Sequence, residues 1–274
     1  MNDIFSFAGK RVAIMGCFSG TGEACARQLV AMGAEVHGAD IKPSPVEGLA
    51  SFTQVDLKDP ASIEAAVKSI GGELDALFNV SGLPQTFPAQ DVVLVNFVGI
   101  RHWTEAWIPH MKKGGAIATV SSLAGLGWTQ RQPVLREFMA ITDFDKAREW
   151  IAAHPDDVTD GYSFSKECIN TWTQLRGVEL VAQDVRINCT MPSPINTPML
   201  NDFKQVAGDA VLSAFSKAKG RHSTPEEQAW PLILLNSGAA AFINGVCLPV
   251  DAGLAGGLTM GVLDIQKMIA EATA

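Results

Sequence analysis

The sequence lacks the patterns on which metal-dependent, disulfide-bonded and serine-hydrolase proteins depend. Its five cysteines show no Cys-x-x-Cys spacing, and its five histidines form no His-Glu-x-x-His. Neither a zinc site nor a disulfide framework is therefore indicated. The Gly-x-Ser-x-Gly elbow of serine hydrolases is also missing. We predict no metal site.

Long apolar runs and a basic surface are missing as well. No uninterrupted apolar segment is long enough to span a bilayer, and residues 1–5 lack the basic region and apolar run of a signal peptide. The formal net charge of -8 and the pI near 5.1 offer no basic face to a nucleic acid or an anionic membrane. We expect a cytoplasmic protein with neither kind of partner.

Length and composition are those of an ordinary globular protein. The 274 residues, 47% of them hydrophobic, are enough for one large core but not clearly for two. No short-period repeat or low-complexity run interrupts the chain. A single domain over residues 1–274 is predicted.

Short apolar runs alternate with helical segments along the chain. Such alternation predicts a parallel sheet covered by helices on both faces, which is an α/β, Rossmann-like, doubly wound fold of about seven strands. The predicted strands are 12–15, 35–39, 52–55, 76–80, 116–120, 185–189 and 246–250. Ligands of such sheets gather at the carboxyl ends of the strands. Polar or turn-forming residues occupy those ends, namely Gly16, Asp40, Asp56, Gly82, Ser122 and Pro192.

The first strand runs into a glycine turn, Gly16-x-x-x-Gly20-x-Gly22, that opens a helix. Glycines let the backbone approach a pyrophosphate, whose charge then meets the free amides at the amino end of the helix. The second strand ends at Asp40, where a carboxylate can accept hydrogen bonds from a ribose and repel a 2′-phosphate. NAD is therefore favoured over NADP, and Lys42 is the one nearby residue that could weaken this preference. Asp56 could contact the adenine edge or be a solvated strand-end carboxylate.

The only tyrosine in the chain, Tyr162, is followed four residues later by Lys166. Residues i and i+4 share one face of a helix, so the ammonium can lie close to the phenol. A nearby positive charge lowers the pKa of a tyrosine from its usual value of about 10 and makes it an acid/base usable near neutral pH. A lone pair of this kind also occurs on ordinary helix surfaces.

Taken together, these motifs resemble those of the short-chain dehydrogenase/reductase family, and the resemblance covers nearly the whole chain. It implies that Tyr162 exchanges a proton with the substrate oxygen and that Ser122 hydrogen-bonds that oxygen. It also implies that Lys166 lowers the tyrosine pKa and binds the nicotinamide ribose. Asn96 would position a water molecule that completes the proton relay. The hydride would move to or from the nicotinamide.

The same resemblance implies which residues contact the NAD cofactor. They are Gly16, Ser19, Gly20, Thr21, Gly22, Asp40, Ile41, Asp56, Leu57, Asn79, Val80, Ser81, Gly82, Tyr162, Lys166, Pro192, Ile195 and Thr197. The chain departs from the family pattern in having Asn79-Val80-Ser81-Gly82 for Asn-Asn-Ala-Gly, and Pro192-Ser193 for Pro-Gly. A serine at position 193 could change the backbone geometry beside the nicotinamide, and hence the contacts expected of Ile195 and Thr197.

The interval between Ser122 and Tyr162 is longer than in most members of the family and predicts an insertion at about residues 126–158. Within the family it most resembles the bacterial coniferyl-alcohol dehydrogenases and the 3α-hydroxysteroid dehydrogenase/carbonyl reductases. The expected substrate is thus a small apolar, ring-bearing alcohol or ketone. Candidates for an apolar pocket are Trp128, Leu135, Met139, Met199, Leu200 and Phe203.

Two segments near the carboxyl end have open interpretations. Residues 199–220 are predicted to form a mobile lid, although a plain connecting helix pair fits the pattern too. The weakly amphipathic tail after Gly257 could pack on a neighbouring subunit or on the pocket. The resemblance implies a homodimer or homotetramer.

The predicted function is an NAD-dependent oxidoreductase that interconverts an alcohol and a carbonyl. Two alternatives remain, an NAD-binding sensor or scaffold without turnover, and a non-redox enzyme on the same fold such as a halohydrin dehalogenase. Lys166 and the intact glycines count against the second of these.

Overall fold

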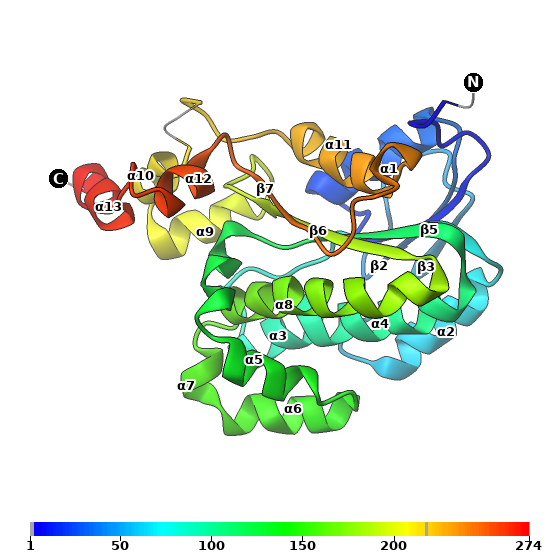
Figure 1. The fold of residues 1–274 in the computed structure, drawn as a ribbon, viewed down its shortest axis with the longest axis horizontal. Coiled ribbons are helices and arrows are strands. Elements are labelled where there is room, and N and C mark those ends of the chain that lie inside the picture. The colour runs from blue at the N-terminus through cyan, green and yellow to red at the C-terminus, as the bar shows by residue number, and fades with distance from the viewer. Residues whose placement is uncertain (1–2, 217–218, 274) are drawn as a thin grey trace.

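The computed structural model describes residues 3–216 and 219–273. Within them the chain forms one parallel sheet of seven strands, in the order β3-β2-β1-β4-β5-β6-β7 (Figure 1). The strands are β1 (Arg11–Met15), β2 (Glu35–Asp40), β3 (Ser51–Gln54), β4 (Leu74–Asn79), β5 (Met111–Val120), β6 (Arg186–Pro192) and β7 (Cys247–Val250). The predicted fold class is confirmed. The strand order reverses between β1 and β4, and ligands of such sheets bind at the point of reversal.

Helices cover both faces of the sheet. Figure 1 shows α1 (Gly20–Ala31) and α11 (Pro225–Asn236) on one face, and α2 (Pro60–Ile70), α4 (Ile100–Trp107) and α8 (Tyr162–Leu180) on the other. Successive side chains of a strand point to opposite faces. Leu77 of β4 accordingly packs in the core under α8, and Phe78 packs in the core under α1 and α11. Both side chains are fully buried.

The helix that follows β4 is not regular throughout. It begins as α3 (Ala89–Val93), widens into the π-helical segment η1 (Leu94–Gly99), continues as α4 and ends in the short 3₁₀ turn η2 (Ile108–His110). A π-helical turn is rare and is found mostly at functional sites. Here it contains Asn96, whose side chain is buried.

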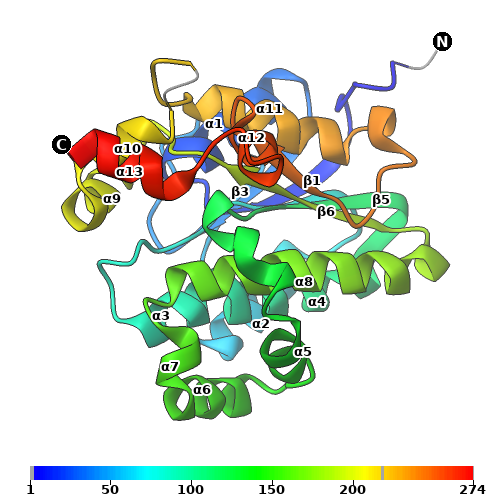
Figure 2. The same ribbon diagram turned by 60° about the vertical axis from the view of Figure 1, so that its left-hand side comes forward.

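The residues expected to form an insertion fold into a layer on the outer side of α8. They comprise the 3₁₀ segment η3 (Leu123–Thr129) and helices α5 (Gln132–Met139), α6 (Phe144–Ala153) and α7 (Pro155–Val158). Figure 2 shows α5, α6 and α7 below α8 and α3. Their apolar side chains bury themselves against the core on that side of the sheet, where Phe138 meets Phe97 with ring centroids 5.9 Å apart.

Four short helices gather at one end of the sheet. They are α9 (Leu200–Ala207), α10 (Asp209–Ala214), α12 (Leu254–Thr259) and α13 (Ile265–Thr273), which lie together at the left of Figure 1. Two further 3₁₀ turns, η4 (Val181–Gln183) and η5 (Gly238–Ala240), lie elsewhere on the chain. Over the ranges 3–216 and 219–273 we find no helix that combines the length and the apolar character needed to cross a bilayer.

Candidate active site

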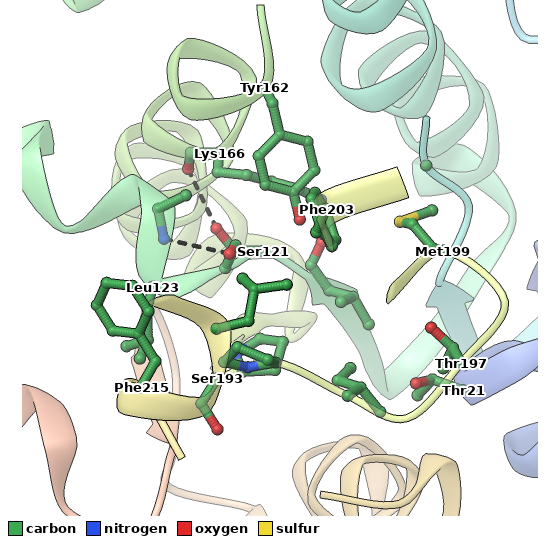
Figure 3. Close-up of a pocket in the computed structure, with 18 of the residues that line it drawn as sticks. Thr21, Ser121, Leu123, Tyr162, Lys166, Ser193, Thr197, Met199, Phe203 and Phe215 are labelled. Carbon is green, nitrogen blue, oxygen red and sulfur yellow. Dashed lines mark hydrogen bonds between the residues drawn. The ribbon is translucent and has the colours of Figure 1, made fainter. Parts of the chain in front are cut away.

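A cavity of about 410 Å³ opens at the carboxyl ends of β1, β4, β5 and β6. One wall is the glycine loop and the first turn of α1. The opposite wall carries Ser122, Tyr162 and Lys166, and the chain after β6 adds Met199 and Phe203. A lid over residues 199–220 stays a prediction. Figure 3 shows Tyr162 directed toward the middle of this cavity, with Phe203 beside it. The two rings meet edge to face, with centroids 5.1 Å apart.

Tyr162 is placed by the glycine before it. It is the first residue of α8, and Gly161 caps the helix with φ of 75°. A Cβ at Gly161 would lie 2.4 Å from the carbonyl oxygen of Ala89. A side chain there would therefore force α8 away from α3, so glycine at this position lets the catalytic helix start where the phenol reaches the cavity.

The surroundings of the Tyr162 phenol act on its pKa in both directions. Burial raises its pKa to about 12, a hydrogen bond with Ser122 lowers it, and the negative charge of Asp160 raises it. Burial has the largest effect because the phenol loses its contact with water. The ammonium nitrogen of Lys166 lies 5.5 Å from the ring centroid, and its lowering of the tyrosine pKa stays a prediction.

Lys166 is itself buried, with 3% of its surface exposed. Burial lowers its pKa to about 8. Its Nζ donates a hydrogen bond to the carbonyl oxygen of Val120 at 3.0 Å, as drawn in Figure 3. Ser121, which sequence reasoning passed over, donates from Oγ to the carbonyl oxygen of Lys166 at 3.1 Å. This pair of bonds fixes the end of β5 against the first turn of α8.

Ser122 begins the η3 segment, and its Oγ accepts a hydrogen bond from the amide of Ala124 at 3.1 Å. Asn96 lies behind the cavity wall. Its Oδ1 accepts from the amide of Leu83 at 2.6 Å, and its Nδ2 donates to the carbonyl of Leu83 at 2.9 Å. A Cβ built at Gly82 would lie 3.4 Å from Asn96 Oδ1 and 4.0 Å from Lys166 Nζ. Asn96 thus stands close to Lys166, and its part in a water relay stays a prediction.

The glycine loop can hold an anionic group. A Cβ at Gly22 would lie 1.7 Å from the carbonyl oxygen of Gly16, and one at Gly16 would lie 2.4 Å from the amide of Ser81. Only glycine allows this close packing. The N-terminal cap of α1, Ser19, makes no side-chain hydrogen bond to the helix in the described chain. The first amides of α1 therefore face the cavity without a side-chain cap, which suits a phosphate.

Asp40 lies at the end of β2, next to the glycine loop. Its carboxylate accepts hydrogen bonds from the amides of Phe18 at 2.9 Å and Lys42 at 3.1 Å. The Nζ of Lys42 lies 5.2 Å from the centroid of the Phe18 ring. Ile41 is 54% exposed beside it. The carboxylate is thus held in place by backbone amides while the lysine cation stacks on an aromatic face.

The structure brings most, but not all, of the expected cofactor residues to the cavity. Those that line it are Ser19, Gly20, Thr21, Gly22, Val80, Ser81, Gly82, Tyr162, Lys166, Pro192, Ile195 and Thr197. Ser193 lines it as well, so this departure from the family pattern leaves Ile195 and Thr197 in place.

The expected cofactor residues that do not line the cavity are Gly16, Asp40, Ile41, Asp56, Leu57 and Asn79. The amide nitrogen of Asn79 donates to the hydroxyls of Thr104 at 2.9 Å and Thr119 at 3.1 Å, inside the core. Asp56 accepts from the amide of Lys58 at 2.8 Å, and Leu57 is buried. Asn79 therefore ties β4 to its neighbours, because its side chain points into the core instead of the cavity.

Most of the residues named as candidates for an apolar pocket do not line the cavity. Met199 and Phe203 line the cavity, but Trp128, Leu135 and Met139 pack in the core against the outer side of α8, and Leu200 is buried away from the cavity. An apolar helix face buries itself against whichever surface is nearest, and for the insertion that surface is the core.

Comparison with known proteins identifies the family. Residues 10–134 match the family described as short chain dehydrogenase, and residues 152–255 match the one described as Enoyl-(Acyl carrier protein) reductase. The coniferyl-alcohol dehydrogenase of Pseudomonas sp. (strain HR199 / DSM 7063) is 32% identical over 247 residues, which cover 90% of this chain and 96% of that protein. The chain belongs to the short-chain dehydrogenase/reductase family. The resemblance seen in the motifs and the expectation of an oxidoreductase are confirmed.

Other members of the short-chain dehydrogenase/reductase family are similar over the same length. The 3-alpha-hydroxysteroid dehydrogenase/carbonyl reductase of Comamonas testosteroni is 28% identical over 250 residues, 89% of this chain and 95% of that protein. Among solved structures, the 3-alpha-hydroxysteroid dehydrogenase from Pseudomonas sp. B-0831 complexed with NADH is 26% identical. It has a TM-score of 0.78 and covers 93% of this chain and 100% of its own.

Several residues of this short-chain dehydrogenase/reductase site were missed by sequence reasoning. Asp160 and Gln85 are polar members of the cavity wall, and Leu212, Leu258 and Ile265 are apolar members. The apolar spacing of the tail after Gly257 was the one available signal for Ile265. For the others no local pattern existed, because their place in the cavity is set by how loops from distant parts of the chain meet.

Proposed function

We propose that the protein is an NAD(H)-dependent oxidoreductase that interconverts an alcohol and a carbonyl on an apolar, ring-bearing substrate. One observation carries the proposal. Ser122, Tyr162 and Lys166 lie on the wall of the same cavity whose opposite side is the glycine loop. A substrate oxygen between the serine and the tyrosine would thus be within reach of a cofactor bound at that loop.

Tyr162 would act as the acid in carbonyl reduction. With a pKa of about 12, the phenol is protonated at neutral pH and can donate its proton to the substrate oxygen. The Ser122 hydroxyl would hold that oxygen by a second hydrogen bond. In the reverse direction the same oxygen atom of Tyr162 accepts the proton. The nicotinamide, when bound, supplies the hydride chemistry.

Lys166 would hydrogen-bond the nicotinamide ribose and stabilise the negative charge of Tyr162 when the tyrosine loses its proton. Its Nζ donates one hydrogen bond to the carbonyl of Val120. A lysine ammonium has further donors, which can bind a ribose hydroxyl. With a pKa of about 8, the ammonium is present at neutral pH. A cation at this place stabilises the phenolate that forms when Tyr162 gives up its proton.

NAD is the proposed cofactor because of Asp40. Its carboxylate stands at the end of β2, where the adenosine ribose of a dinucleotide would lie, and would repel a 2′-phosphate. Support comes from the similar structure of a Pseudomonas enzyme, which is described as complexed with NADH. The cavity would take the nicotinamide between Gly82 and Ile195, both of which line it.

The substrate class is supported by the cavity wall and by the relatives. Beside Tyr162 the wall includes the apolar side chains Leu123, Met199, Phe203 and Phe215. Two similar proteins are named for coniferyl alcohol and for 3-alpha-hydroxysteroids, both of which carry rings. We propose a ring-bearing substrate of one of these two kinds.

The test is turnover by wild-type protein and by Tyr162→Phe, followed through the absorbance of reduced nicotinamide. Cinnamyl-type alcohols, hydroxysteroids and small cyclic alcohols are each offered with NAD and with NADP. We expect activity with NAD, and a fall of kcat by about 10²- to 10⁴-fold in the variant, because a positioned acid/base contributes that much. The variant keeps its ring, so NADH should bind to it unchanged.

Each alternative gives a different result. Activity with NADP alone would mean that Asp40 does not select the cofactor. A Tyr162→Phe variant that kept most of its activity would remove Tyr162 from the mechanism. NADH binding without turnover of any substrate would favour a sensor or scaffold protein.

A further inference from the structure

The last two helices of the chain reach into the candidate active site. Leu254 and Leu258 of α12 and Ile265 of α13 line the same cavity as Tyr162. They line it together with Leu212 of α10, which packs against α13, and with Phe215 just after α10. The wall that the chain's carboxyl end adds to the cavity is thus made of aliphatic side chains.

Hydrogen bonds within this segment fix where α12 begins and ends. The carboxylate of Asp251 accepts hydrogen bonds from the amides of Gly253 and Ala255 at 2.9 and 2.6 Å and starts α12. Helix α12 ends in a Schellman motif, in which the amides of Gly261 and Val262 donate to the carbonyls of Leu258 and Gly257. Gly261 has the positive φ, 66°, that this ending requires.

Two further contacts set the direction of α13. A Cβ at Gly257 would lie 2.5 Å from Cδ1 and 2.7 Å from Cγ of Leu263, so Leu263 packs directly on the bare backbone of α12. Asp264 then starts α13 by accepting hydrogen bonds from the amides of Gln266 and Lys267 at 2.9 and 3.1 Å. The turn between the helices is therefore held at both ends.

Helix α13 packs against α10, which contributes Leu212 to the cavity wall. Figure 2 shows the two lying side by side, with α9 next to them. An ion pair between Lys204 and Asp209, with N and O 2.7 Å apart, joins α9 to α10. Helices α9, α10 and α13 consequently form one layer beside the cavity.

We propose that α12 and α13 form the outer wall of the substrate site, and that Leu258 and Ile265 determine which substrates fit. The inference rests on the proposed oxidoreductase function and deepens it. Among the described residues of these two helices, those that line the cavity are all aliphatic. The part of the substrate farthest from the reacting oxygen must therefore be apolar and uncharged, and large enough to reach this wall.

The test compares two alcohols of different size, a 3α-hydroxysteroid and cyclohexanol. Each is offered to wild-type protein and to Ile265→Ala. A hydroxysteroid whose oxygen is held at Tyr162 should reach the outer wall, and cyclohexanol should not. Ile265 is 39% exposed, so shortening it removes only part of an isoleucine's contact. We expect KM for the hydroxysteroid to rise by about 3- to 10-fold, with kcat and the KM for cyclohexanol unchanged. Val262→Ala is the control, because Val262 is 79% exposed three residues earlier.

A second pair of variants tests the placement of the whole helix. Gly257→Ala meets Leu263, whereas a Cβ at the neighbouring Gly256 meets nothing within 4 Å. The first should displace α13 and reproduce the effect of Ile265→Ala on the hydroxysteroid, and the second should not. Equal KM values for all variants, or an equal change for both alcohols, would overturn the assignment of this wall.

Calorimetric titration of both alcohols into NADH-loaded protein separates the two proposals. Weaker hydroxysteroid binding in Ile265→Ala supports the outer wall even if the wild-type protein turns over neither alcohol, an outcome that would contradict only the oxidoreductase proposal. Unchanged binding in a catalytically active variant contradicts only the outer wall. A wild-type protein that binds neither alcohol overturns both.

Discussion

Asp160 is a charged residue of the candidate active site, and the motif pattern did not single it out. Its carboxylate lines the cavity, and its charge raises the pKa of Tyr162. It also accepts a hydrogen bond from the amide of Ser163 at 3.1 Å, in the first turn of α8. The residue therefore combines a local structural bond with an electrostatic influence on the phenol.

Replacing Asp160 by Asn should separate these two effects. The amide oxygen can still accept from Ser163, but the negative charge that disfavours the phenolate is gone, so the pKa of Tyr162 falls. The pH at which alcohol oxidation reaches half its maximal kcat/KM should move to lower pH. We expect a shift of less than about one pH unit, because an exposed carboxylate is screened by water.

The measurement is the pH profile of kcat/KM for oxidation in wild-type and Asp160→Asn protein. Asp156→Asn is the matched control, since it removes the same charge from an exposed position in α7 outside the cavity. A profile that shifts equally in both variants would assign the effect to net charge alone. A profile that does not move in Asp160→Asn would contradict the electrostatic role.

At the scale of elements, the catalytic helix is held from outside by the insertion. Arg131, just before α5, donates to the carboxylate of Glu167 at 2.7 Å and to the carbonyl of Asp157 at 2.7 Å. Glu167 follows Lys166 on α8 and has 7% of its side chain exposed. Burial raises the pKa of Glu167 and the charge of Arg131 lowers it. One arginine thus joins three elements around the first turns of α8.

Arg131→Ala should destabilise the protein by about 3 kcal/mol at pH 8, because it leaves a buried carboxylate without its partner. Loss of the cation raises the folded-state pKa of Glu167 further above its unfolded value. Above the unfolded value the folded state then holds more protons than the unfolded state, so stability falls as pH rises. The destabilisation should consequently be smaller at pH 5 than at pH 8.

Urea denaturation at the two pH values measures this effect. Arg136→Ala serves as the control, since Arg136 is exposed on α5 and donates a hydrogen bond to an uncharged side chain, that of Gln132. Adding Glu167→Gln to Arg131→Ala should restore most of the lost stability and remove the pH dependence. If the double variant were as unstable as the single one, the charge of Glu167 would not be the cause.

The elements themselves were largely predictable, and the side-chain partners were not. The predicted strand 12–15 is β1 (Arg11–Met15), and 246–250 is β7 (Cys247–Val250). Apolar runs bounded by turns identify buried strands because the pattern is local. The cavity wall formed by Leu258 and Ile265 depends on contacts between α13 and α10, about fifty residues apart in the chain. No periodicity tells whether an apolar face meets the core, as Leu135 does, or a cavity.

At the scale of the whole molecule, the candidate active site buries the cation of Lys166 in the folded protein. Lys166 projects from α8 to the end of β5 at the cavity wall, and burial lowers its pKa from 10.5 to about 8. The unfolded chain therefore binds more protons than the folded protein between these two values. Stability rises with pH across that window, and below pH 8 the folded protein carries the full penalty of the buried charge.

Lys166→Met should remove this penalty. The difference in free energy of unfolding between variant and wild type should be most favourable to the variant near pH 7, and should fall by on the order of 3 kcal/mol toward pH 10. The hydrogen bond to Val120 is lost as well, which lowers the variant's stability.

Chemical denaturation from pH 7 to pH 10 follows the difference, with Lys113→Met as the control, because Lys113 is exposed at the start of β5. The control difference should be flat. Parallel curves for Lys166→Met and wild type would mean that the lysine is neutral or hydrated in the folded protein. A slope of the expected sign, together with lost turnover, would mean that the molecule keeps a destabilising buried cation because catalysis requires its charge.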